Sequence, residues 1–160
     1  MTANRMANTR VKIGDVVEIE TKKGLSYAQY THESEEDGSL LRVFATSYSE
    51  PPTDLAEVVR GEVAFTAFFP LRAAIKQGLV RRAGRAEITP ENRIWPMFRW
   101  GIPHPVSKKV GQWYIWDGTD YWKIDSLSDE QRKWPIRSIL LMEGLTTRIE
   151  EGWRPETDPR

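Results

Sequence analysis

Two short clusters of carboxylates come nearest to a chemical motif in this 160-residue chain. Their members are Glu33, Glu35, Glu36, Asp37, Asp117 and Asp120. Two carboxylates held about 5 to 9 Å apart in a pocket can cleave a glycosidic bond by acid–base chemistry. Both clusters coincide with reverse-turn signals, however, where acidic side chains bond to nearby backbone and face water. We therefore predict solvated turns here and no catalytic residues.

Histidine and cysteine, the commonest residues of metal and nucleophile chemistry, are scarce. The chain has no cysteine, and its two histidines, His32 and His104, lie 72 positions apart. Paired ligands such as HExxH are absent, so we predict no metal site and no cofactor. Phosphate-binding glycine loops and a Gly-x-Ser-x-Gly elbow are also missing. A Ser-His-Asp arrangement stays open, because its members can be distant in sequence, but we expect no enzyme activity.

Tryptophans gather near the second acidic cluster, with four of the seven between residues 111 and 137. Alternation along a strand sends neighbouring side chains to opposite faces, so some must point outward unless both faces are covered. Exposed aromatic residues among acids suit a protein-binding surface, whereas a two-sided core would bury them. On the first interpretation the candidate contact residues are Glu33, Glu35, Glu36, Asp37, Trp116, Asp117 and Asp120.

A basic stretch suggests an alternative, although the net charge of the whole chain is zero. Residues 71–110 carry nine bases and two acids, between acidic flanks. Its basic and aromatic members include Arg81, Arg82, Arg85, Arg93 and Arg99 together with Trp95, Phe98 and Trp100. Such interleaving could bind single-stranded nucleic acid by charge and stacking. The near-neutral pI of about 6.8 argues against that partner, so nucleic-acid binding through 81–100 is the second choice.

The elements that position these residues can be predicted from periodicity and turn chemistry. Alternating apolar residues predict strands over 11–19, 25–31, 40–45 and 62–69, and an Asp-Gly turn predicts a hairpin over 113–124. Capping residues predict short helices over 54–61, 70–78, 128–135 and 141–152. The predicted class is a β-rich α+β fold, with a strongly bent antiparallel sheet or small partial barrel and three to four short helices.

The domain organisation follows from length and from the ends of these patterns. We predict a flexible N-terminal tail over 1–10, one globular domain over 11–153 and a C-terminal tail over 154–160. No apolar segment approaches the roughly 20 residues that span a bilayer, and no apolar run follows the basic N-terminal residues. We expect a cytoplasmic protein with no membrane partner.

Two early segments carry a resemblance to a known family. The segment 12–19, KIGDVVEI, followed by 24–28, GLSYA, resembles the start of the immunity protein 26 family of bacterial polymorphic toxin systems. Looser similarities are 69–71, FPL, and 96–98, PMF. The resemblance implies an antitoxin-like protein that binds a cognate toxin stoichiometrically, blocks its active site or traps an inactive state, and catalyses nothing. Acidic turns would then steer a basic, nucleic-acid-attacking toxin.

Overall fold

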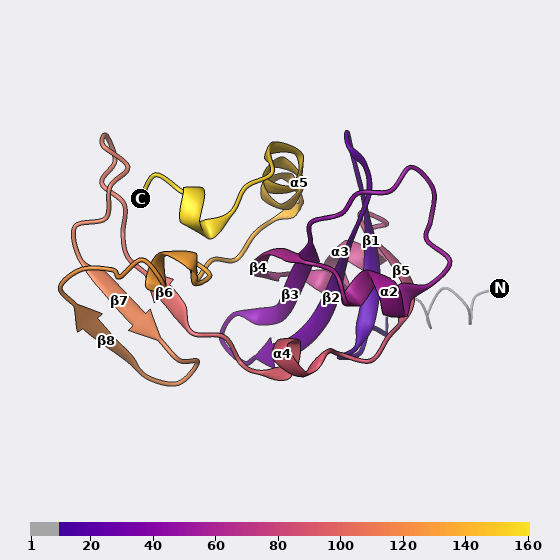
Figure 1. Ribbon diagram of the computed structural model, residues 1–160, viewed down its shortest axis with the longest axis horizontal. Helices are drawn as coiled ribbons and strands as arrows, with labels where there is room; N and C mark the ends of the chain where they lie inside the picture. The colour runs from indigo at the N-terminus through magenta and orange to yellow at the C-terminus, as the bar shows by residue number, and fades with distance from the viewer. Residues whose placement is uncertain (1–9) are drawn as a thin grey trace.

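The computed structural model describes residues 10–160 as two antiparallel sheets lying side by side, with short helices around them (Figure 1). The fold is α+β and β-rich, as predicted, and its described strands close no barrel. The predicted tail over 1–10 lies, apart from its last residue, outside the described part of the chain. None of the helices within residues 10–160 is long and apolar enough to cross a membrane.

The larger sheet has five strands in the order β4-β3-β2-β1-β5. Their bounds are β1 Asp15–Thr21, β2 Gly24–Ser34, β3 Gly38–Phe44, β4 Val63–Phe69 and β5 Arg81–Arg85. The first three strands form a meander with short connections, and β4 pairs with β3 after a longer connection that contains a helix. Register shifts interrupt the β1–β5, β2–β3 and β3–β4 pairings. Such bulges bend strands and increase their twist, which gives this sheet its curvature.

Helices cover both faces of this sheet. They are α2 Leu55–Val59, α3 Leu71–Lys76 and α5 Met142–Glu151. Leu71 of α3 and Leu145 of α5 join the apolar cluster on one face, and Val58 of α2 joins the cluster on the other. Local signals set the helix ends, since Asp54 caps α2 through the Ala56 amide at 3.0 Å and Gly152 ends α5 at a φ of 65°.

The smaller sheet, at the left in Figure 1, has three strands in the order β6-β7-β8. Their bounds are β6 Phe98–Trp100, β7 Trp113–Trp116 and β8 Tyr121–Ile124, and the predicted Asp-Gly hairpin joins the last two. The helical turns α4 Pro90–Arg93, η1 Gln131–Lys133 and η2 Pro155–Thr157 complete the fold. Because core side chains pack on both faces of β7, Trp113 and Trp116 are both buried.

Residues 135–140 connect the two sheets. This segment forms parallel bridges from Ile136 to Arg99 of β6 and from Ile139 to Phe68 of β4. Backbone hydrogen bonds accompany both bridges, including Arg99 N to Pro135 O at 2.9 Å and Leu140 N to Phe68 O at 2.9 Å. The same chain segment therefore pairs with a strand of each sheet. The two sheets also share an apolar, mainly aromatic cluster of Leu40, Phe68, Phe98 and Trp116, with Trp95 packed against it.

The buried guanidinium of Arg99 holds the C-terminal residues against the smaller sheet. Arg99 is 1% exposed and donates hydrogen bonds to the carbonyls of Arg132, Trp134 and Pro155. Burial lowers its pKa to about 10, so it remains charged at neutral pH. The predicted tail over 154–160 instead contains η2, with Pro155 buried. The polar, proline-containing sequence of residues 154–160 does not indicate this order, because the contact that fixes the segment comes from the distant Arg99.

We expect Arg99→Met to lower the free energy of unfolding by about 2 to 4 kcal/mol, because three carbonyls lose a charged donor. Arg81→Met is the matched control, since the Arg81 side chain is 68% exposed in its pair with Glu18. Arg81→Met should lower the free energy of unfolding by less than about 1 kcal/mol. Chemical denaturation of both variants measures the difference, and equal stabilities would contradict the role given to Arg99.

Candidate functional site

The two predicted acidic turns meet in space and form one groove between the sheets. The β2–β3 turn supplies one wall and the β7–β8 turn the other, although about eighty residues separate them in the chain. The groove has a cavity volume of about 390 Å³. Its lining residues are Glu33, Ser34, Glu35, Glu36, Trp95, Asp117, Gly118 and Thr119. Four of these are acidic and none is basic, so the groove favours a cationic ligand.

Arg137 joins the first turn to the second sheet. Its guanidinium donates two hydrogen bonds to the Asp37 carboxylate, at 2.8 and 3.1 Å, and one to Glu36 at 3.0 Å. Its Cζ atom also lies 3.6 Å from the centre of the Trp116 ring. A bidentate pair of this kind is geometrically specific, and the aromatic face adds a cation–π attraction. The Asp37 hydrogen bond raises the pKa of Arg137, because it stabilises the charged guanidinium.

The hairpin tip is held by its own aspartate. Asp117 Oδ1 accepts the backbone amides of Thr119 at 2.9 Å and Asp120 at 2.8 Å. These donors lower the pKa of Asp117, since they stabilise its charged form. Gly118 has a φ of 100°, and a Cβ there would lie 2.6 Å from Trp95 Nε1. Glycine is therefore required both by the turn and by the close approach of Trp95.

Charge around the groove is only partly compensated. Two guanidinium groups pair with the acids, Arg72 with Glu33 at 3.6 Å and Arg137 with Asp37 and Glu36. Six carboxylates at the two turns against these two arginines leave an excess of four negative charges. Neither Glu35 nor Asp120 has an ion-pair partner among the described residues. These two carboxylates are therefore the ones most available to a partner.

Trp95 lies along the groove with its apolar surface toward the core. Its ring centre is 5.8 Å from that of Trp116 and 5.5 Å from that of His32. The indole Nε1 is buried and has no hydrogen-bond partner. Sequence reasoning missed this side chain as part of the acidic site, because it falls in the basic stretch. Arg137 was missed too, since it follows Pro135 in a segment without periodicity.

All the predicted contact residues except Trp116 lie in the groove or beside it. Glu33, Glu35, Glu36 and Asp117 line the groove, and Asp120 lies exposed at the same hairpin tip. Asp37 is at the junction, where its side chain is 10% exposed and paired with Arg137.

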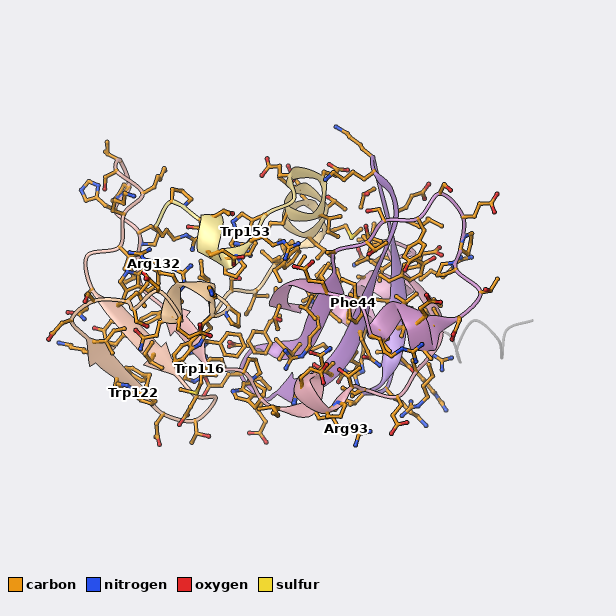
Figure 2. The ribbon with its side chains drawn as sticks, viewed as in Figure 1. Phe44, Arg93, Trp116, Trp122, Arg132 and Trp153 are labelled. Atoms are coloured by element: carbon orange, nitrogen blue, oxygen red, sulfur yellow. The ribbon has the colours of Figure 1, made fainter. Side chains whose placement is uncertain are left out.

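Trp116 is not at the surface, contrary to the expectation for a contact residue. It is 3% exposed, because Phe68 and Phe98 pack against it and Arg137 covers its ring. Figure 2 places Trp116 at the junction of the sheets and Trp122 on the outer strand of the smaller sheet. Trp116 therefore supports the groove from beneath.

A row of aromatic side chains continues outward from this junction. Trp100, Tyr114 and Tyr121 share the face of the smaller sheet that carries Trp116. The Tyr114 ring lies 5.0 Å from Trp100 and 5.9 Å from Tyr121, centre to centre. Tyr121 is 65% exposed and directly opposite Trp116 in the strand register. An aromatic surface thus adjoins the acidic hairpin tip.

The arginines of the basic stretch have partners within the protein. Arg81 pairs with Glu18 at 2.6 Å, and Arg82 and Arg85 pair with the fully buried Asp15 at 2.9 and 3.4 Å. Arg93 pairs with Glu87 at 2.7 Å and also donates to the Ile88 carbonyl, while Arg99 and Phe98 are buried. Each of these five arginines is therefore already paired or hydrogen-bonded within the protein, which argues against a nucleic-acid-binding surface here.

The two histidines serve local structure. His32 Nε2 lies 2.9 Å from the Arg93 carbonyl, and His104 Nδ1 accepts the amides of Val106 and Ser107. Within residues 10–160, no group of three or more histidine or carboxylate side chains is placed to hold a metal ion.

No family model, curated protein or solved structure matches this chain.

We expect NMR titration to give His32 a pKa below its ordinary value of 6.5, because burial disfavours its charged form and Arg42 repels it. The folded chain then binds fewer protons than the unfolded chain, so stability falls as pH drops from about 7 toward 5. His32→Gln should weaken this pH dependence, whereas His104→Gln serves as the control. A His32 pKa above 6.5 would contradict the burial effect.

Proposed function

We propose that this protein binds and neutralises a bacterial protein toxin stoichiometrically, without catalysis, and that the acidic groove receives a basic segment of the toxin. The observation that carries this proposal is the convergence of two sequence-distant acidic turns on one groove with no basic lining residue. The similarity of segments 12–19 and 24–28 to an immunity protein family supports the same role.

Electrostatics supports a basic partner. Several uncompensated negative charges on one surface accelerate encounter with a cationic protein and repel nucleic acid. The effect decays over about 8 Å at physiological salt, so the steering charges must lie at the contact itself. Glu35, which lines the groove, and Asp120, at the adjoining hairpin tip, satisfy this condition because both are exposed.

Aromatic residues beside the acids support protein recognition rather than simple ion attraction. The half-buried Trp95 and the exposed Tyr121 offer surfaces on which lysine or arginine side chains can pack by cation–π contact. Tryptophan, tyrosine and arginine dominate the energetics of protein interfaces. A basic toxin loop could thus gain both charge pairing and apolar burial here.

The test uses the toxin encoded by a neighbouring toxin-bearing reading frame. Co-expression should rescue growth, and purified toxin should bind this protein with an affinity that falls as salt increases. We expect the double variant Glu35→Lys/Asp120→Lys to weaken binding at least about 100-fold and to abolish rescue, because like charges would face each other.

The control is Glu20→Lys/Glu50→Lys, which changes the net charge equally at exposed acids outside the groove. Its affinity should stay within about threefold of the unmodified protein. Equal losses in both double variants, or no binding at all, would overturn the proposal. Tight, salt-sensitive RNA binding in a gel shift would favour the nucleic-acid role instead.

A further inference from the structure

The outer edge of β8 is an open sheet edge. Segment 135–140 covers the outer edges of β4 and β6 through its parallel bridges. Within residues 10–160, no strand pairs with the outer edges of β5 and β8, and Figure 1 shows β8 at the outer side of the smaller sheet. An open edge presents backbone N–H and C=O groups that can pair with a further strand. These two edges are therefore the places where the sheets could be extended.

Hydrogen-bond alternation identifies the open backbone groups of β8. The Asp117 amide donates to the Asp120 carbonyl at 3.1 Å, so this pair closes the hairpin. Bonded and non-bonded pairs alternate along an antiparallel ladder. Trp122 is therefore bonded to β7, whereas Tyr121 and Lys123 direct their backbone groups outward. A partner strand would bond to these two residues.

Only one antiparallel register between two copies of β8 uses all of these open groups. In this register Tyr121 of one copy lies opposite Lys123 of the other, and each such pair exchanges its backbone hydrogen bonds. Trp122 then lies opposite Trp122 of the other copy, on a two-fold axis. A register centred on Lys123 would place two lysines opposite each other. A register centred on Tyr121 would require Thr119, whose amide already donates to Asp117.

The side chains along this register are complementary. Trp122 is 45% exposed and Tyr121 is 65% exposed. The two indoles would meet at a non-hydrogen-bonded pair, where side chains approach most closely and aromatic pairs stabilise a sheet. On the other face, the Lys123 ammonium would lie against the Tyr121 ring of the other copy in a cation–π contact. Pairing would thus cover the large exposed aromatic side chains of β8.

The β5 edge, in contrast, is protected by charge. The side chains of Arg81, Arg82 and Arg85 are 68%, 37% and 56% exposed. Two paired copies of β5 would bring several guanidinium groups together, and like charges opposite each other destabilise a sheet. Charged side chains are a common protection of native sheet edges. In β8 the only charged residue is Lys123, and the register above places it opposite an aromatic ring.

We propose that two copies of this protein associate through the outer edges of β8, so that the three strands of each smaller sheet join in one continuous antiparallel sheet about a two-fold axis. The contact is short, so it belongs with interfaces smaller than about 1,200 Å² and should be reversible, with a dissociation constant of about 10 to 100 μM. Neither Tyr121 nor Lys123 lines the acidic groove, and the proposal does not depend on toxin binding.

Sedimentation velocity of the full chain, from about 1 to about 500 μM, measures this association, and a shift from monomer to dimer is expected over that range. Lys123→Pro removes an outward amide without removing a bond to β7, so it should weaken dimerisation at least about 50-fold. Lys123→Thr is the matched control, because it removes the same charge but keeps the amide. Its dissociation constant should stay within about fivefold of the unmodified protein.

Amide hydrogen exchange locates the contact in the unmodified chain, so it does not depend on how Lys123→Pro folds. The Tyr121 and Lys123 amides should exchange freely in dilute protein and become protected as the concentration rises. A protein that stays monomeric up to about 500 μM would overturn the proposal. So would a dimer that forms equally in Lys123→Pro, or one that leaves these two amides unprotected.

Discussion

The arrangement of the two sheets depends on the contacts of one side chain, Arg137. Its guanidinium is held by the Asp37 carboxylate on one side and by the Trp116 ring on its face. The backbone of the same residue donates to the Arg99 carbonyl of β6 at 2.9 Å. Exposed ion pairs contribute little to stability, but this pair is largely shielded and bidentate, and it acts together with the aromatic cluster beneath it.

This junction explains why an acidic groove exists at all. Asp37 and Glu36 lie at the end of the β2–β3 turn, so fixing them to the second sheet brings Glu35 close to the Asp117–Asp120 tip. The same arginine neutralises part of the acidic charge, which reduces repulsion between the turns. The carboxylates that remain unpaired are at the outer edge, where a partner would meet them first.

Local signals in the sequence predicted most of the elements correctly. Asp117 and Gly118 predicted the hairpin, and Ser128 with Gln131 predicted a capping box whose two reciprocal bonds are present at 2.9 and 3.1 Å. These features depend on residues only a few positions apart.

What could not be predicted depends on distant contacts. Nothing near Arg137 indicates that its partner is Asp37, one hundred positions earlier. Nothing near Pro155 indicates that its carbonyl accepts a hydrogen bond from the buried Arg99. For the same reason the sequence left open whether Trp116 is core or surface, and it placed the acidic clusters in separate turns without indicating that they share a groove.

The most direct measurement is the distance between the two walls of the groove. The chain has no cysteine, so spin labels at Glu35→Cys and Thr119→Cys, both exposed positions, would be specific. We expect a single narrow distance distribution by pulsed electron spin resonance, and a broader one when Arg137→Ala is added. A broad distribution before that change, or an identical one after it, would contradict the central role of Arg137.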